Sequence, residues 1–154
     1  MWNETEEEAE FELSQLKKLI ELNSSILNKF QSVAPAKTDL WALATILHSF
    51  HMGMESIFKR IAKNIDGGVP PGPSWHKELV ESMAKSNSLR PAVISQKLKT
   101  ILEKYLTFRQ AFLYLSSCDL EWREMKPLIV GAKETLNLFD KEISAFFAAG
   151  KKEG

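Results

Sequence analysis

The sequence is poor in the residues that mark secreted, membrane and disulfide-rich proteins. It has one cysteine, Cys118, so an internal disulfide is excluded, and this usage is typical of a reducing compartment. No stretch approaches the roughly 18 apolar residues that a membrane-spanning helix needs. The chain opens with Trp2, Asn3 and then acids, which is unlike a secretory signal. We therefore expect a cytoplasmic protein without a membrane segment.

Several catalytic signatures are also missing. The chain has no glycine-rich phosphate loop, no nucleophile elbow and no histidine or cysteine cluster with the spacing of a zinc site. It has only three histidines, His48, His51 and His76. These absences argue against P-loop nucleotide hydrolysis, α/β-hydrolase chemistry and zinc catalysis, and we expect no cofactor.

The net charge is zero, but the two signs are unevenly distributed. Residues 1–50 hold four basic and eight acidic side chains, a balance of −4, and residues 51–154 hold sixteen and twelve, a balance of +4. This is far from the strong positive excess of an autonomous nucleic-acid binder. If RNA is a ligand, we expect it in a local cleft rather than over a broad basic face.

Helical periodicity dominates the rest of the chain. Apolar residues recur at three- and four-residue steps in four long segments, about 4–30, 38–65, 91–115 and 119–147. Thr38 or Asp39 is predicted to cap the second segment, Pro91 to lie in the first turn of the third, and Asp119 to cap the fourth. A kink or restart is expected at Pro127.

A shorter helix is predicted between the second and third long segments. It begins at Ser74, after a loop rich in proline and glycine (66–73), and extends to about Ala84. The predicted fold is all-α, an antiparallel bundle of four long helices plus one short helix. Residues 1–150 should form a single domain, and residues 151–154 a disordered tail.

His48, His51 and Glu55 are spaced by three and four residues, so they share one side of the second helix. That geometry suits part of a metal site. The simpler interpretation is a one-turn pair between His51 and Glu55, with His48 near the surface. We favour this interpretation because no ligand from a second helix is evident. His76, beside Trp75 at the proline loop, is interpreted as part of a packing anchor.

Arg109 is the most informative charged residue. It lies four residues after Tyr105 and three before Phe112, on the inward side of the third long helix. An unpaired buried charge is costly, so its guanidinium must pair with an acid, reach solvent, or face a partner chain or an anionic ligand. From spacing alone, a structural ion pair with Glu55 or another acid of the bundle is favoured.

Several segments together resemble the HepT-like domain of the HEPN superfamily. The resemblance is carried by Ser49–Ala62, Ile65-Asp66-Gly67, Trp75–Leu79, Arg90–Ser95, Tyr105–Arg109 and Leu120-Glu121-Trp122. These segments occur in the family's order and at its spacing, between about residues 40 and 147. The resemblance implies an all-helical bundle that dimerises, with the active cleft at the subunit interface and a minimal nucleotidyltransferase as antitoxin partner.

Active members of that family cut RNA without a metal, using an arginine and a histidine four to six residues apart. Arginine would hold the scissile phosphate and histidine would move protons at the 2′-hydroxyl. Arg109 matches the arginine, but Tyr114 occupies the histidine position, Ser116 the tyrosine position two residues beyond, and Gln110 the position after the arginine. A tyrosine hydroxyl, with an ordinary pKa near 10, is a poor proton carrier at neutral pH.

The resemblance therefore predicts a HepT-like protein of toxin–antitoxin type with a degenerate catalytic motif, which binds RNA or a partner protein through a dimer cleft. One alternative is an active or weakly active metal-independent ribonuclease, with Arg109 aided by Tyr114 or His51. Another is a helical adaptor between proteins. The candidate catalytic residues are Arg109, Tyr114 and Glu55, the candidate RNA-binding residues are Arg109 and Gln110, and no metal ligand is assigned.

Overall fold

The computed structural model describes residues 2–113 and 120–153, with side chains through residue 150. Within these residues the chain forms seven α-helices, one π-helical segment and no named strand. The helices are α1 (Trp2–Leu22), α2 (Ser24–Lys29), α3 (Lys37–Ile61), α4 (Trp75–Met83), α5 (Gln96–Phe112), α6 (Trp122–Val130) and α7 (Ala132–Glu153), and η1 (Ala62–Asp66) extends α3.

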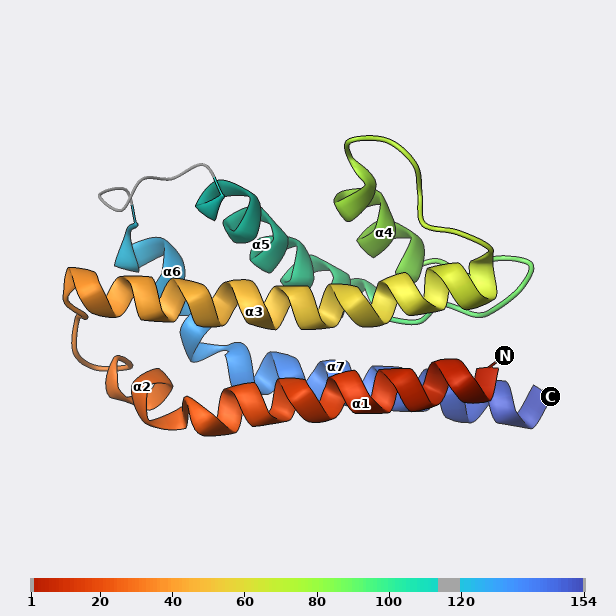
Figure 1. Ribbon diagram of the computed structural model, residues 1–154, viewed down its shortest axis with the longest axis horizontal. Coiled ribbons are helices and arrows are strands. Elements are labelled where there is room, and N and C mark those ends of the chain that lie inside the picture. The colour runs from red at the N-terminus through yellow and green to blue at the C-terminus, as the bar shows by residue number, and fades with distance from the viewer. Residues whose placement is uncertain (1, 114–119, 154) are drawn as a thin grey trace.

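The long helix α3 is the centre of the bundle (Figure 1). Helices α1 and α7 lie along one side of it, with the two chain ends at the same end of the bundle, and α4, α5 and α6 lie on the other side. Its buried residues include Leu43, Phe50, Ile57 and Phe58, and they form a broad stripe opposite a narrow exposed face that holds Thr45 and Ser49. A residue of α3 can therefore meet side chains from several helices.

The all-α class is confirmed, but the count of four long helices and one short helix is wrong. The first predicted helix is divided at Asn23, whose side-chain amide donates to the Leu19 carbonyl at 2.8 Å and competes with the regular backbone pattern. The last predicted helix restarts at Gly131, four residues after Pro127, and the Gly131 amide donates to the Pro127 carbonyl at 3.0 Å.

The other predicted helix starts have mixed outcomes. The N-cap of α3 is Ala36 rather than Thr38 or Asp39, and Asp39 lies in the first turn, where its carboxylate accepts the Ala36 amide at 3.1 Å. The short helix α4 follows Ser74 as predicted. Pro91 does not begin α5, because Ser95 caps that helix by accepting the Leu98 amide at 3.1 Å. The predicted cap at Asp119 lies outside the described residues.

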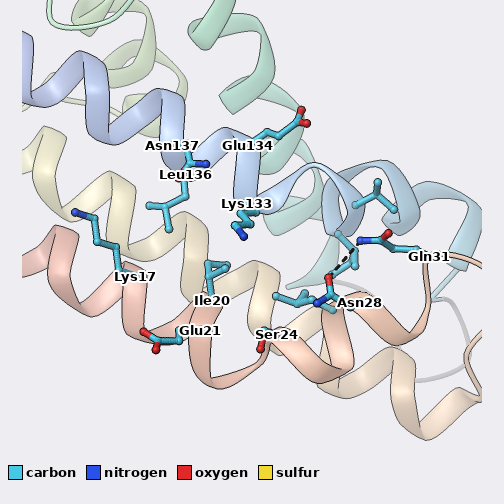
Figure 2. Close-up of a pocket in the computed structure, with 13 residues that line it drawn as sticks. Lys17, Ile20, Glu21, Ser24, Asn28, Gln31, Lys133, Glu134, Leu136 and Asn137 are labelled. Carbon is cyan, nitrogen blue, oxygen red and sulfur yellow. Dashed lines mark hydrogen bonds between the residues drawn. The ribbon is translucent and has the colours of Figure 1, made fainter.

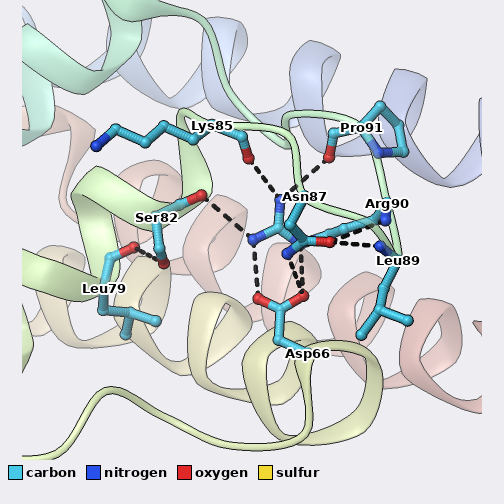
Figure 3. Close-up of polar contacts among 8 residues, drawn as sticks. All are labelled: Asp66, Leu79, Ser82, Lys85, Asn87, Leu89, Arg90 and Pro91. Carbon is cyan, nitrogen blue, oxygen red and sulfur yellow. Dashed lines mark hydrogen bonds and ion pairs between the residues drawn. The ribbon is translucent and has the colours of Figure 1, made fainter.

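Arg90 closes the loop that links α4 to α5 (Figure 3). Its side chain is 1% exposed and meets Asp66 in a two-point ion pair, Nε to Oδ1 at 2.7 Å and Nη2 to Oδ2 at 2.8 Å. Its Nη groups also donate to the carbonyls of Ser82, Lys85 and Pro91. This network fixes the loop against η1, the segment that extends α3.

None of the helices in the described part of the chain combines the length and the apolar composition needed to cross a membrane. The domain limits of 1–150, with a tail at 151–154, stay a prediction. Gly154 and the side chains of 151–153 lie outside what the structure describes.

Candidate functional site

Arg109 lies in the last turn of α5, where the helix passes the first half of α3. The side chain is half-buried, and its Nε is enclosed without a hydrogen-bond partner. No carboxylate among the described residues forms an ion pair with it. The structural ion pair with Glu55 that spacing favoured is therefore wrong.

His48 is the neighbour of Arg109 on α3. Its ring lies 6.0 Å, between centroids, from the ring of Phe112, which follows Arg109 by one turn of α5. Burial lowers the pKa of His48 below 6.5, and the nearby charges of Arg109 and His51 lower it further. His48 is therefore neutral at physiological pH and has an unprotonated ring nitrogen available.

Glu55 holds two histidines from different helices. Its Oε2 lies 3.3 Å from His51 Nε2, one turn away on α3, and 2.6 Å from His76 Nδ1 on α4. The predicted one-turn pair between His51 and Glu55 is thus present, and His76 joins it. Burial raises the pKa of Glu55, but hydrogen bonds from His51 and His76, with their charges, outweigh burial and lower it to about 2.

The ionised Glu55 carboxylate determines how His51 is protonated. A carboxylate only accepts hydrogen bonds, so the facing Nε2 of His51 must carry a proton. In the neutral ring the lone pair is then on Nδ1. His51 Nδ1 is buried and has no partner, and the Nδ1 of His48, one turn earlier on α3, has none either.

Unpartnered buried nitrogens are concentrated at this place. Four side-chain atoms of the described residues are buried without a partner, and three of them belong to His48, His51 and Arg109. Buried polar groups are nearly always hydrogen-bonded, so a cluster of exceptions indicates a site that a ligand or water completes. We define His48, His51 and Arg109 as the imidazole–arginine cluster.

The other candidate residues are not part of this cluster, or they lie outside the residues that the structure describes. Gln110 is exposed on α5. Tyr114 and Ser116 lie outside the described residues, as does Cys118. Trp75 stacks on His76 with ring centroids 3.6 Å apart, and the Lys59 ammonium lies 5.0 Å from the Trp75 ring. His76 therefore contacts Glu55 from the α4 side, and Trp75 stacks on the His76 ring.

The partial metal site considered for His48, His51 and Glu55 gains no further ligand among the described residues. Across residues 2–113 and 120–150, no group of three or more His, Cys, Asp or Glu side chains is placed to hold a metal ion. His51 and His76 instead direct their nitrogens at one oxygen of Glu55.

A separate groove lies between α1 and α2 on one wall and α6 and α7 on the other (Figure 2). It has a volume of about 600 Å³. Its rim mixes Lys17 and Lys133 with Glu21 and Glu134, over a floor that includes Ile20 and Leu136. It contains neither a histidine nor Arg109, so it does not extend the imidazole–arginine cluster.

Comparison with known proteins agrees with the resemblance noted in the sequence. Residues 42–149 match the family model of HepT-like proteins, a range that includes every member of the imidazole–arginine cluster. The chain belongs to the HepT-like protein family. No curated protein and no solved structure matches it.

The sequence pointed to Arg109, His51 and Glu55 and placed His48 near the surface, which agrees with its half-buried side chain, but it did not place His48 beside Arg109. His76 was interpreted only as part of a packing anchor. The spacing of three between His48 and His51 was the available signal, because it places both imidazoles on one side of α3. The role of His76 depends on the path of the loop at 67–74, which periodicity does not determine.

Proposed function

We propose that this HepT-like protein binds RNA at the imidazole–arginine cluster, with the Arg109 guanidinium contacting a backbone phosphate. The observation that carries the proposal is the half-buried Arg109 side chain, whose Nε has no partner and whose charge meets no described carboxylate. A guanidinium presents a planar set of donors that fits phosphate oxygens.

The distribution of charge supports a local site of this kind. The protein as a whole is neutral, so general attraction to the RNA backbone is weak, and binding must depend on a few well-placed donors. His48 is half-buried and lies close enough to Arg109 for the guanidinium to lower its pKa. A ligand held by Arg109 would therefore also lie near this imidazole.

The proposal extends to partners that the family suggests. We propose a homodimer in which the imidazole–arginine clusters of two copies lie near the shared interface. Exposed apolar side chains next to the cluster support this. Trp41 is 38% exposed and Leu113 is 55% exposed. The Trp41 ring packs against the Phe112 ring, with 5.6 Å between the ring centroids. Light scattering on the purified protein measures the molar mass in solution and so tests for the dimer. The substitution Trp41→Glu should lower that mass to the value of the monomer.

A toxin–antitoxin role, in the cytoplasm and with a minimal nucleotidyltransferase as the antitoxin, is part of the same proposal. It predicts growth arrest when the protein is expressed alone and relief when a neighbouring nucleotidyltransferase gene is expressed with it. No arrest, or arrest that the nucleotidyltransferase leaves unchanged, argues against this role while leaving RNA binding to be judged by its own test.

RNA binding is tested by fluorescence anisotropy with labelled single-stranded RNA and tRNA at fixed salt. We expect Arg109→Ala to weaken binding about 10- to 100-fold, which is about 1.4–2.8 kcal/mol. Arg123→Ala removes an exposed arginine on α6 and serves as the matched control, with little effect expected. Equal affinities for wild type and Arg109→Ala would refute the phosphate contact.

If Arg109→Ala leaves RNA affinity unchanged but lowers the free energy of unfolding by several kcal/mol, the arginine is structural. The protein is then better described as a helical adaptor between proteins.

A further inference from the structure

The groove between α1–α2 and α6–α7 lies where both of its walls are interrupted (Figure 2). One wall breaks at Asn23, between α1 and α2, and the other at Gly131, between α6 and α7. A helix break leaves backbone groups without an intrahelical partner. Residues on both sides of each break line the same groove: Ile20, Glu21 and Ser24 at the first, and Ile129, Val130 and Lys133 at the second. The groove is therefore associated with paired breaks in two helical walls.

The two walls carry free charges of opposite sign. Glu21 lies in the last turn of α1 and Lys133 in the first turn of α7, and neither forms an ion pair with another described residue. Lys17 is already neutralised by Asp140 at 3.1 Å. Glu134 also lines the groove, but its carboxylate points away from α1 and α2 (Figure 2). The charges that remain for a ligand are thus one negative group and one positive group on opposite walls.

The surface between these charges is aliphatic and rich in carboxamides. The floor consists of Ile20, Leu27, Ile129 and Leu136, and Val130 is 44% exposed at the edge. Three carboxamide side chains, each able to donate and to accept hydrogen bonds, also line the groove: Asn28, Gln31 and Asn137. None of the described lining residues is aromatic.

This composition argues against a nucleic acid as the ligand. Proteins bind single-stranded nucleic acid through an excess of positive charge and through aromatic rings on which bases stack. The groove has balanced charges and no ring among its described residues. Its volume of about 600 Å³ falls in the range of about 300–1,000 Å³ that is usual for sites of small ligands.

We infer that the groove binds a short peptide with aliphatic side chains and free ends, with its carboxylate at Lys133 and its ammonium group at Glu21. The aliphatic floor receives the side chains of the peptide, and the three carboxamides bond to its backbone amide and carbonyl groups. This site is separate from the imidazole–arginine cluster, so the inference goes beyond RNA binding and does not depend on it.

The test titrates a leucine–alanine–leucine tripeptide with free ends into the full chain and follows the methyl signals of Ile20 and Leu136 by ¹H–¹³C NMR. We expect these signals to shift and to saturate. Lys133→Ala and Glu21→Ala should each weaken binding about 10-fold, which is about 1.4 kcal/mol. Lys126→Ala removes an exposed lysine of α6 outside the groove and should bind like wild type. Positions 21 and 133 are exposed, so both variants should keep the fold.

Chemically blocked peptides test which end meets which residue. If Lys133 holds the carboxylate, an amidated carboxyl end should weaken binding to wild type about as much as Lys133→Ala does. The amidated peptide should then bind wild type and Lys133→Ala equally, because both changes remove the same interaction. Acetylation of the amino end should show the same relation to Glu21→Ala. Losses that simply add in both pairs would overturn the assigned contacts.

Three other results would overturn the inference. The methyl signals could fail to shift, or shift without saturating at millimolar peptide. Wild type and both groove variants could bind the peptide equally. Single-stranded RNA could displace the peptide, which would assign the groove to nucleic acid. The first two results leave RNA binding at Arg109 untouched, because that proposal is judged by its own anisotropy measurement.

Discussion

The side chains of Arg90 and Arg109 both lie partly or fully inside the helical bundle, yet their guanidinium groups differ in their hydrogen-bond partners. Arg90 bonds to both oxygens of Asp66 and to three backbone carbonyls (Figure 3). Arg109 has a buried Nε without a partner and no described carboxylate in ion-pair range. The donors of Arg90 are bonded within the protein, whereas the Nε of Arg109 has no partner among the described residues.

This difference separates a charge that the fold pairs internally from the one that we propose binds a ligand. A buried guanidinium with its donors bonded fixes the segments around it, and in this protein those segments are η1 and the loop before α5. A guanidinium with an enclosed, unused donor costs stability unless a ligand completes it. Substitutions at and around the two arginines should therefore affect different properties.

The largest effect on stability is expected at Arg90. Arg90→Ala leaves Asp66 and three carbonyls without their donor, so the free energy of unfolding should fall by about 3–5 kcal/mol. Urea denaturation followed by circular dichroism measures it. Arg123→Ala, at an exposed position, should stay within about 0.5 kcal/mol of wild type. A similarly small loss at Arg90 would mean that the network is not structural.

A pH-dependent effect is expected at Glu55. Its pKa in the folded protein is about 2, below the ordinary value of 4.5, so its contribution to stability is present above pH 4.5 and is lost as the pH falls toward 2. Glu55→Gln should thus be less stable than wild type near neutral pH, by about 1–3 kcal/mol. Urea denaturation between pH 2 and 7 should show this difference shrink in acid, and a constant difference would contradict the assignment.

Arg109 should have little influence on stability. Arg109→Ala removes no ion pair with a described residue, so we expect a change below about 1 kcal/mol in the free energy of unfolding. The same denaturation experiment compares it directly with Arg90→Ala. A loss as large as that of Arg90→Ala would remove the distinction between the two arginines.

The smallest effect is a pKa shift at His48. Burial and the charges of Arg109 and His51 hold its pKa below 6.5, so the neutral ring stabilises the fold above that pH and the contribution declines as the pH falls. Arg109→Ala should raise the pKa of His48 toward 6.5, as followed by NMR titration of the ring. An unchanged pKa would place Arg109 too far from His48 for a shared site.

The fold class was predictable because helical periodicity is strong, but the helix boundaries depended on local contacts. The break at Asn23 depends on a side-chain bond to Leu19, and the start of α5 depends on Ser95 rather than Pro91. The restart after Pro127 comes at Gly131, where a residue without a side chain ends α6. Each of these hydrogen bonds involves one or a few residues, so it does not alter the hydrophobic periodicity of the sequence.

The sequence predicted which candidate residues share a side of one helix, but not which residues of different helices lie next to each other. Spacing placed His51 with Glu55 and marked Arg109 as an inward charge. It did not place His48 beside Arg109, because that contact depends on how α5 crosses α3. Arg90 was noted only within the resemblance, and its pairing with Asp66 spans 24 residues and a loop.

The side-chain Nε–H signals of Arg90 and Arg109 in a ¹H–¹⁵N NMR spectrum test the central distinction within one sample. On titration with single-stranded RNA, the Arg109 signal should shift and saturate with the binding isotherm, while the Arg90 signal stays in place. An Arg109 signal that does not move at saturating RNA would contradict the account, because RNA would then bind away from the guanidinium that the fold leaves unpaired.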